Sequence, residues 1–220
     1  MPEFSQFQST FIVLSGKTGS FKSAVLKCLA SLQYPVIDLE RIARHRGSVF
    51  GSTGIDEPQP PQQFFEKQLQ QICEGYHSRP FIFTEQKPSS IGKRKIPDWF
   101  YTKMQEGLVV ELHVPKNLRV QNILKEYFDT EKKQQNIPGP VSKLSGRLSK
   151  EKIIMLQELI LQKKYAAFVN DILDYYDTAS RYQPGSKKPF IEIFTDGEYN
   201  VERLTKQILQ SLDQKGITLS

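Results

Sequence analysis

Apolar residues in this chain follow two patterns: short continuous runs, and longer segments in which they recur every three or four positions. Short runs bounded by turn residues predict buried strands, whereas a spacing of three or four predicts amphipathic helices. Strands are predicted at Phe11–Leu14, Pro35–Leu39, Pro80–Glu85, Leu108–Leu112 and Pro189–Phe194. Helices are predicted at Lys22–Leu32, from about Gln63 to Glu74, near Leu118–Lys132 and at Val201–Leu212.

Strands and helices alternate along most of the chain, and this order predicts a parallel sheet flanked by helices. The exception is a long helical segment before the last predicted strand, which follows the break Ile137-Pro138-Gly139-Pro140. Its apolar positions recur at helical spacing, at Leu161, Tyr165, Val169, Ile172 and Tyr176. We therefore expect an α/β fold in one domain, residues 1–220, with a helical insertion at about 116–183.

The junction between the first predicted strand and the first predicted helix carries the strongest local motif. Gly16, Lys22 and Ser23 keep the spacing of G-x-x-x-x-G-K-[ST], a P-loop or Walker A motif, although Phe21 stands where the last glycine belongs. In such a loop, backbone N–H groups surround phosphate oxygens, the lysine reaches the phosphates and the hydroxyl ligates Mg²⁺. The motif predicts a P-loop NTPase-like sheet and a phosphate site built from Gly16, Lys17, Thr18, Gly19, Ser20, Lys22 and Ser23.

A phenylalanine at position 21 changes what this loop is expected to do. A side chain there takes up a positive φ only at a steric cost, and its bulk approaches the phosphates. We therefore expect nucleotide binding that is weakened, reshaped or lost.

Acidic residues at the ends of neighbouring strands are candidates for the metal site of the loop. Asp38 and Glu85 each follow an apolar run, and Glu40 fits the same role less well. Because ligands of parallel sheets gather at the carboxyl ends of the strands, these side chains are expected to converge on the loop. The expected Mg²⁺ ligands are Ser23, Asp38 and Glu85.

Composition and charge narrow the class of partner. No apolar run approaches the ~20 residues of a membrane span and the N-terminus lacks a signal-peptide pattern, so we expect a cytoplasmic protein without membrane contact. Cys28 and Cys73 form no C-x-x-C motif, which argues against zinc and redox sites, and both are expected in the core. The net charge is +6, but residues 41–48, 86–103 and 141–164 together carry +11. This segregation favours a polyanionic partner.

A longer pattern after the loop resembles a known family. Asp38-Leu39-Glu40, Ala43, His45-Arg46-Gly47-Ser48, Phe50-Gly51, Pro58-Gln59-Pro60, Gln62 and Phe65-Glu66 follow one another as in the C-terminal P-loop domain of tRNA 2-selenouridine synthase. Glu85 with Ser90-Ile91-Gly92 and Ile96-Pro97, Leu144 to Leu148, and Tyr165 to Tyr176-Asp177 extend the resemblance over most of the chain. The His-Arg-Gly-Ser run is far more specific than any P-loop.

This resemblance implies modification of the wobble 2-thiouridine of tRNA, with sulfur exchanged for selenium through an S-geranyl intermediate. It implies geranyl pyrophosphate as a ligand of the loop, with Mg²⁺. Arg44, His45, Arg46, Gly47 and Ser48 are then expected to bind the substrate. Lys93, Arg94, Lys95, Lys143 and Arg147 are expected to bind tRNA. Trp99, Phe100 and Tyr101 could stack an unpaired base, but such aromatic residues are more often core or helix-start residues.

The sequence also departs from the family pattern. Gln86-Lys87-Pro88 replaces an acidic stretch after Glu85, and the rhodanese domain with its active-site cysteine does not precede the loop. Three alternatives stay open: a separate rhodanese protein is a partner, the chain is an excised domain, or the activity has changed. Two rival functions also stay open, a small ATP-dependent kinase or NTPase, and a degenerate P-loop module that binds tRNA without turnover.

Overall fold

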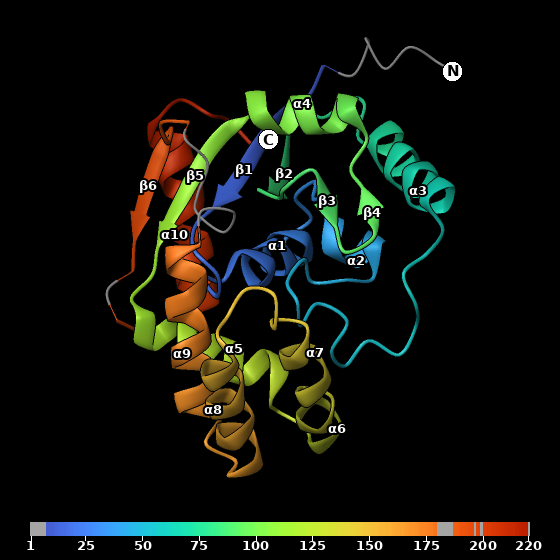
Figure 1. The fold of residues 1–220 in the computed structure, drawn as a ribbon. Coiled ribbons are helices and arrows are strands. Elements are labelled where there is room, and N and C mark those ends of the chain that lie inside the picture. The colour runs from blue at the N-terminus through green and yellow to red at the C-terminus, as the bar shows by residue number, and fades with distance from the viewer. Residues whose placement is uncertain (1–7, 180–186, 196, 199, 220) are drawn as a thin grey trace.

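The fold is built on a parallel sheet of four strands in the order β2-β1-β5-β6 (Figure 1). The computed structural model describes residues 8–179, 187–195, 197–198 and 200–219. The strands are β1 (Thr10–Ser15), β2 (Phe81–Glu85), β5 (Leu108–His113) and β6 (Ile191–Phe194). All three pairings are parallel. The expected α/β fold is therefore confirmed.

Both faces of the sheet are covered, which explains why β1 reads as a continuous apolar run. Phe11 and Val13 of β1 pack with helices α3 (Gln62–Gly75) and α4 (Asp98–Glu106). Ile12 and Leu14 face the other side, against α1 (Lys22–Ser31) and α10 (Val201–Gln214). The alternation puts two apolar layers on opposite sides of one strand. Cys73 belongs to the first layer and is buried, whereas Cys28 of α1 is only half-buried.

The predicted strand at Pro35–Leu39 is wrong over most of its length. The segment makes one parallel bridge, from Val36 to Phe83 at the edge of β2, and then turns into helix α2 (Leu39–Ala43). The turn occurs because the Asp38 carboxylate accepts a hydrogen bond from Arg41 N at 2.9 Å and so caps the helix. The apolar run therefore supplies a sheet edge and a helix start in place of a full strand.

The segment from β2 to α4 holds elements that the sequence patterns did not predict. Ser90–Ile91 and Arg94–Lys95 form a short antiparallel hairpin, β3 and β4. Gln59 holds the turn, because its side chain donates to Ile91 O and accepts from Lys93 N. The residues Trp99 to Tyr101 lie in α4, where Phe100 is fully buried and the other two rings pack against the same core. The expected stacking role is thereby excluded for Phe100.

The expected helical insertion contains five helices within its described residues, 116–179, and lies beyond the carboxyl ends of the strands (Figure 1). They are α5 (Lys116–Tyr127), α6 (Glu131–Gln135), α7 (Pro138–Ser142), α8 (Lys150–Leu161) and α9 (Tyr165–Thr178). The predicted helix to Lys132 ends at Tyr127, and the predicted break at 137–140 is instead the start of α7. Helices α5, α7, α8 and α9 contribute to a third apolar cluster that includes Phe128, Phe168 and Ile172. Positions 180–183 of the predicted insertion lie outside the described residues.

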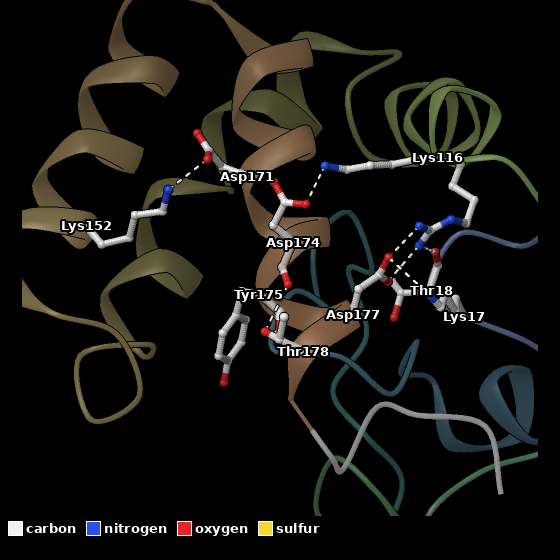
Figure 2. A network of polar contacts seen from close by, with 10 residues as sticks. Lys17, Thr18, Lys116, Lys152, Asp171, Asp174, Tyr175, Asp177 and Thr178 are labelled. Atoms are coloured by element: carbon white, nitrogen blue, oxygen red, sulfur yellow. Dashed lines mark hydrogen bonds and ion pairs between the residues drawn. The ribbon is translucent and has the colours of Figure 1, made fainter.

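Three carboxylates along α9 connect this helix to its neighbours (Figure 2). Asp171 pairs with Lys152 of α8 at 2.7 Å, and Asp174 pairs with Lys116 of α5 at 2.5 Å. Asp177 pairs with Arg119 of α5 at 2.6 Å and reaches Lys17 of the P-loop at 3.5 Å. Helix α9 is thus attached to both neighbouring helices and to the loop.

No helix in the described parts of the chain is both long and apolar enough to cross a membrane.

Candidate functional site

The loop between β1 and α1 has the backbone shape that a phosphate-binding loop needs. Gly16 and Gly19 have φ angles of 135° and 83°, in the region that favours glycine. A Cβ atom on Gly16 would lie 2.7 Å from Leu112 O of the neighbouring strand, so a side chain does not fit there. No described side chain caps the N-terminus of α1, which leaves that end of the helix suited to an anion.

Phe21 takes the left-handed conformation that the glycine of the motif would take, with φ of 67°. For a residue with a side chain this conformation costs about 1–2 kcal/mol. The ring is only 4% exposed and packs with core residues such as Val25 and Leu26, so burial offsets the strain. Phe21 therefore takes up the positive φ at the expected steric cost, and weakened, reshaped or lost nucleotide binding stays a prediction.

Lys22 holds its ammonium group over the loop. Its Nζ donates to Gly16 O at 2.7 Å, to Lys17 O at 3.0 Å and to Ser20 Oγ at 3.2 Å. Burial lowers the pKa of Lys22 to about 8, although the nearby carboxylates of Glu85 and Glu40 act in the opposite direction. The group sits where the P-loop lysine meets phosphate oxygens.

Glu85, at the carboxyl end of β2, is a buried carboxylate beside the loop. It is 1% exposed, and burial, followed by repulsion from Glu40, raises its pKa to about 7. Lys87 Nζ lies 2.9 Å from Glu85 Oε2 and forms a second ion pair with Glu40 Oε1. The first contact is an ion pair by distance only, because neither Glu85 oxygen accepts an aligned hydrogen bond from the described residues. Burial lowers the pKa of Lys87, but the two carboxylates outweigh it and raise the pKa above its ordinary value.

Of the three expected metal ligands, Ser23 and Glu85 line the cavity at the loop, whereas the Asp38 carboxylate binds the start of α2. Ser23 Oγ donates to Glu40 Oε2 at 3.3 Å, so Glu40 is the acid that meets this hydroxyl. Asp38 instead caps α2, as described above. In the described part of the chain, no group of three or more His, Cys, Asp or Glu side chains is placed to hold a metal ion.

The His-Arg-Gly-Ser run forms a turn whose side chains are mostly engaged by the protein. Arg46 donates to Thr53 O, pairs with Glu126 at 3.2 Å and lies over the Tyr127 ring. His45 Nδ1 accepts from Gly47 N at 3.1 Å, and burial lowers the pKa of His45, which favours the neutral ring. Ser48 Oγ accepts from Phe50 N.

These residues face two adjoining hollows. Arg46, Gly47 and Ser48 line the cavity that contains the P-loop. Arg44 lines a neighbouring hollow of about 350 Å³ and pairs with Glu57 at 2.6 Å. Arg46 lines this second hollow as well, and His45 lines neither of the two, so the five expected substrate residues do not share one site.

The cavity at the P-loop has a volume of about 570 Å³ and a lining of two kinds. The charged and polar part, here called the polar end, includes Gly16, Lys22, Ser23, Glu40, Glu85 and Lys87. The apolar part, here called the apolar wall, consists of Phe50 and, from the insertion, Phe128, Ile137, Phe168, Val169 and Ile172, beside polar insertion residues that include Asn122, Lys125 and Glu126. Of these positions, the sequence pattern placed Val169 and Ile172 on an amphipathic stripe that packs against other elements. Helical spacing cannot distinguish a side chain that fills a core from one that also borders a cavity, since both lie on the same stripe.

Helix α5 supports the loop from behind through two residues that no sequence motif marks. Arg119 is 3% exposed, donates to Thr18 O at 3.1 Å and binds both oxygens of Asp177 at 2.9 and 2.6 Å. Asn122 Nδ2 donates to Gly19 O at 3.0 Å. Polar residues inside a helix usually indicate a solvated face, so the sequence offered no signal for this contact.

The expected tRNA residues lie on two separate elements. Lys93, Arg94 and Lys95 belong to the β3–β4 hairpin, where Lys93 is exposed and Lys95 pairs with Asp98 at 2.9 Å. Lys143 and Arg147 are exposed in the segment between α7 and α8. Lys143 lies close enough to His45 to help lower the pKa of that residue. The second group therefore lies near the turn of the His-Arg-Gly-Ser run.

Comparison with known proteins adds a family to this geometry. Residues 9–212 match the family model described as "tRNA 2-selenouridine synthase AAA domain". The chain is similar to tRNA 2-selenouridine synthase of Nitrosomonas eutropha, 32% identical over 74% of this chain and 42% of that protein. It is also similar to the protein of that name from Shewanella sediminis, 31% identical over 82% of this chain and 55% of that protein. The chain thus spans about half the length of these relatives.

Among solved structures, shikimate kinase from Acinetobacter baumannii in complex with shikimate is similar at a TM-score of 0.39 and 16% identity. The match covers 99% of this chain and 100% of that one. A similarity at this level adds nothing to the fold that the sheet order already shows.

Replacing Phe21 by glycine tests whether the buried ring outweighs the backbone strain. Loss of a buried phenyl ring costs about 3–5 kcal/mol, and relief of the left-handed strain returns about 1–2 kcal/mol. We expect Phe21→Gly to lower the free energy of unfolding by about 2–3 kcal/mol in a urea titration, on the difference of those two values. Phe21→Leu, which keeps an apolar side chain, should lose less. A glycine variant as stable as the wild type would contradict this balance.

Replacing Arg119 tests the support that α5 gives to the loop. Arg119→Met leaves the Asp177 carboxylate and Thr18 O without their buried donor, and we expect a loss of about 3 kcal/mol in the free energy of unfolding. The matched control is Lys152→Met, which breaks the partly exposed pair with Asp171 on the same helix and should cost about 1 kcal/mol or less. Equal losses would show that Arg119 is no more than a surface charge.

Proposed function

Because this chain belongs to the tRNA 2-selenouridine synthase AAA domain family, we propose that its P-loop holds the pyrophosphate of a prenyl donor, with geranyl pyrophosphate as the expected ligand. The reaction served is modification of the wobble 2-thiouridine of tRNA. The observation that supports this ligand is the joining of a P-loop to an apolar wall within one cavity. One end of the cavity suits a pyrophosphate and the other suits a hydrocarbon chain.

The polar end has the groups that a departing pyrophosphate requires. The start of α1 and the glycine-rich backbone offer N–H groups, and Lys22 adds a positive charge. When a prenyl carbon is transferred, negative charge grows on the leaving pyrophosphate, and fixed donors aimed at that charge lower the barrier. The loop therefore contributes to leaving-group stabilisation as well as to binding.

The apolar end favours a prenyl chain over an adenosine. Phe128, Phe168 and Ile172 of the insertion present rings and branched carbons to the cavity. Each methylene removed from water contributes about 0.8 kcal/mol, so a ten-carbon chain gains affinity from such a wall. A ribose placed against these apolar side chains would leave its hydroxyl groups without hydrogen-bond partners there, which costs free energy. This contrast separates the proposed ligand from the ATP of the rival kinase or NTPase function.

The sulfur or selenium chemistry requires a reactive thiol, which we assign to a rhodanese domain outside residues 1–220. Cys73 is buried, and burial raises the pKa of its thiol to about 12, so it is not a nucleophile near neutral pH. Cys28 lies within α1, in the same helix that begins at Lys22. The role proposed for the chain is therefore to hold the donor and the tRNA.

The proposed tRNA contact is the basic β3–β4 hairpin. Its residues lie next to Pro88 and Lys87 in sequence, and these two line the P-loop cavity. A stem-loop bound there through its phosphates would bring an unpaired base towards the ligand. Lys143 and Arg147 offer a second basic group on the insertion side.

The ligand assignment is tested by calorimetric titration with geranyl pyrophosphate and ATP side by side, with magnesium chloride present. We expect geranyl pyrophosphate to bind at least about tenfold more tightly than ATP, on the area that the prenyl chain buries. Lys22→Ala should weaken the binding of geranyl pyrophosphate. Unchanged affinity in that variant would remove the loop from the site, and tighter ATP binding with turnover would favour the kinase or NTPase.

The apolar wall is tested by two neighbouring residues of α9. Ile172→Ala shortens the wall and should lower the affinity for geranyl pyrophosphate about tenfold without changing that for inorganic pyrophosphate. Leu173→Ala is the matched control, because Leu173 is equally buried in the same cluster and is not part of the cavity wall. If both variants bind geranyl pyrophosphate as the wild type does, the prenyl chain does not lie on this wall.

The hairpin is tested by the salt dependence of tRNA binding. Replacing Lys93, Arg94 and Lys95 together by glutamine should lower the slope of log affinity against log salt by about 2, at ~0.7–0.9 for each phosphate that is no longer neutralised. The matched control replaces three exposed lysines elsewhere, Lys67, Lys206 and Lys215. An unaltered slope in the hairpin variant would exclude this surface.

A further inference from the structure

The ammonium group of Lys87 lies between the two carboxylates that flank the P-loop. Lys87 follows the end of β2 by two residues, and its side chain is 11% exposed. Its Nζ pairs with Glu40 Oε1 and lies 2.9 Å from Glu85 Oε2. All three residues line the cavity together with Lys22 and Ser23. A positive charge is thus fixed at the phosphate end of the cavity by the chain itself.

This is the region in which a P-loop protein usually binds its divalent cation. In such proteins, the hydroxyl that follows the loop lysine and an acid from a neighbouring strand share a Mg²⁺ ion. Ser23 and Glu85 are the corresponding groups here. Ser23 Oγ is directed to Glu40 Oε2 at 3.3 Å, and the opposite oxygen of Glu40 is taken by Lys87.

The residues present do not fit a divalent ion in this arrangement. Mg²⁺ requires near-octahedral oxygen ligands at 2.0–2.1 Å and usually keeps several waters. A protonated lysine has no lone pair to offer and repels a dication.

The packing around Lys87 keeps its ammonium in this place. Gly47 has φ of 73°, and a Cβ atom there would lie 3.4 Å from Glu40 Oε1 and 3.6 Å from Lys87 Nζ. The glycine therefore lets the turn of the His-Arg-Gly-Ser run lie close to the ion pair. Glu40 and Glu85 hold the ammonium from two carboxylates at once.

We infer that Lys87 replaces the divalent cation, so that this loop binds a pyrophosphate group without a metal ion. Lys22 and Lys87 flank the phosphate oxygens, while Glu40 and Glu85 hold Lys87 in position. The inference rests on the proposed pyrophosphate binding at the loop. In this arrangement, the ammonium of one lysine provides positive charge at the place where a bound ion provides it in other P-loop proteins.

The test compares pyrophosphate binding with and without divalent ions. Wild-type protein is titrated calorimetrically with inorganic pyrophosphate and with geranyl pyrophosphate, in excess EDTA and in excess magnesium chloride. We expect the two affinities for each ligand to agree within about threefold, because the ammonium is already in place. A loss of about tenfold or more in EDTA would overturn the inference and leave the proposed ligand intact. Absence of binding in both buffers would overturn both.

Variants at position 87 provide the second readout. Lys87→Gln should lower pyrophosphate affinity in EDTA about tenfold or more, the scale of one charge-assisted hydrogen bond. Lys87→Asp should bind poorly in EDTA and recover in magnesium chloride, because it restores an acid beside Glu85. Lys67→Gln, on the exposed face of α3, is the matched control and should leave binding unchanged in both buffers.

Circular dichroism establishes whether each variant folds. If the position-87 variants fail to fold, the wild-type comparison in EDTA still decides the question. Unchanged affinity of a folded Lys87→Gln in EDTA would overturn the inference.

Discussion

Burial of the Glu85 carboxylate at the end of β2 is the constraint around which the site is arranged. A charge that is 1% exposed needs compensation, and the chain provides it with Lys87 on one side and Lys22 near the loop. Glu40 then shares Lys87 and receives the hydroxyl of Ser23. Removing any one of these groups leaves an uncompensated neighbour. The polar end of the cavity therefore depends on these mutually paired charged groups as well as on the glycines of the loop.

The insertion contributes to the same site in two physical ways. Through Arg119 and Asn122, helix α5 holds the carbonyl groups of Thr18 and Gly19, which fixes the outer side of the loop. Through Phe168 and Ile172, helix α9 adds the apolar wall opposite the charges. Asp177 joins the two functions, because it binds Arg119 and lies on the helix that carries the wall. A change in the packing of the insertion would therefore affect both the loop and the ligand chain.

The combination of a polar loop and an apolar wall in one cavity is the basis for the ligand that we propose for this chain. A P-loop alone is common to many phosphate ligands, and the basic hairpin alone suits any polyanion. Within one cavity of about 570 Å³, the loop and the apolar wall support the proposed donor, which has a pyrophosphate head and a hydrocarbon tail. The buried thiol of Cys73 is consistent with a chain that holds the donor while another domain handles sulfur or selenium.

The sequence by itself determined the parallel α/β order, the P-loop and the family. Each of these depends on a pattern within a short continuous segment, such as Phe11 to Ser23 or His45 to Ser48. It did not show that Asp38 would cap a helix while Glu40 met Ser23, since both acids follow the same apolar run. From the sequence, Lys87 is a base at a position where the family pattern has an acidic stretch, and the apolar residues of α9 are residues that pack against other helices. Only the tertiary structure placed Lys87 between two carboxylates and turned those apolar residues towards the loop. The physical reason is separation along the chain, because Lys87 meets Glu40 across 47 positions and α9 meets the loop across 160, through Lys17 and Asp177.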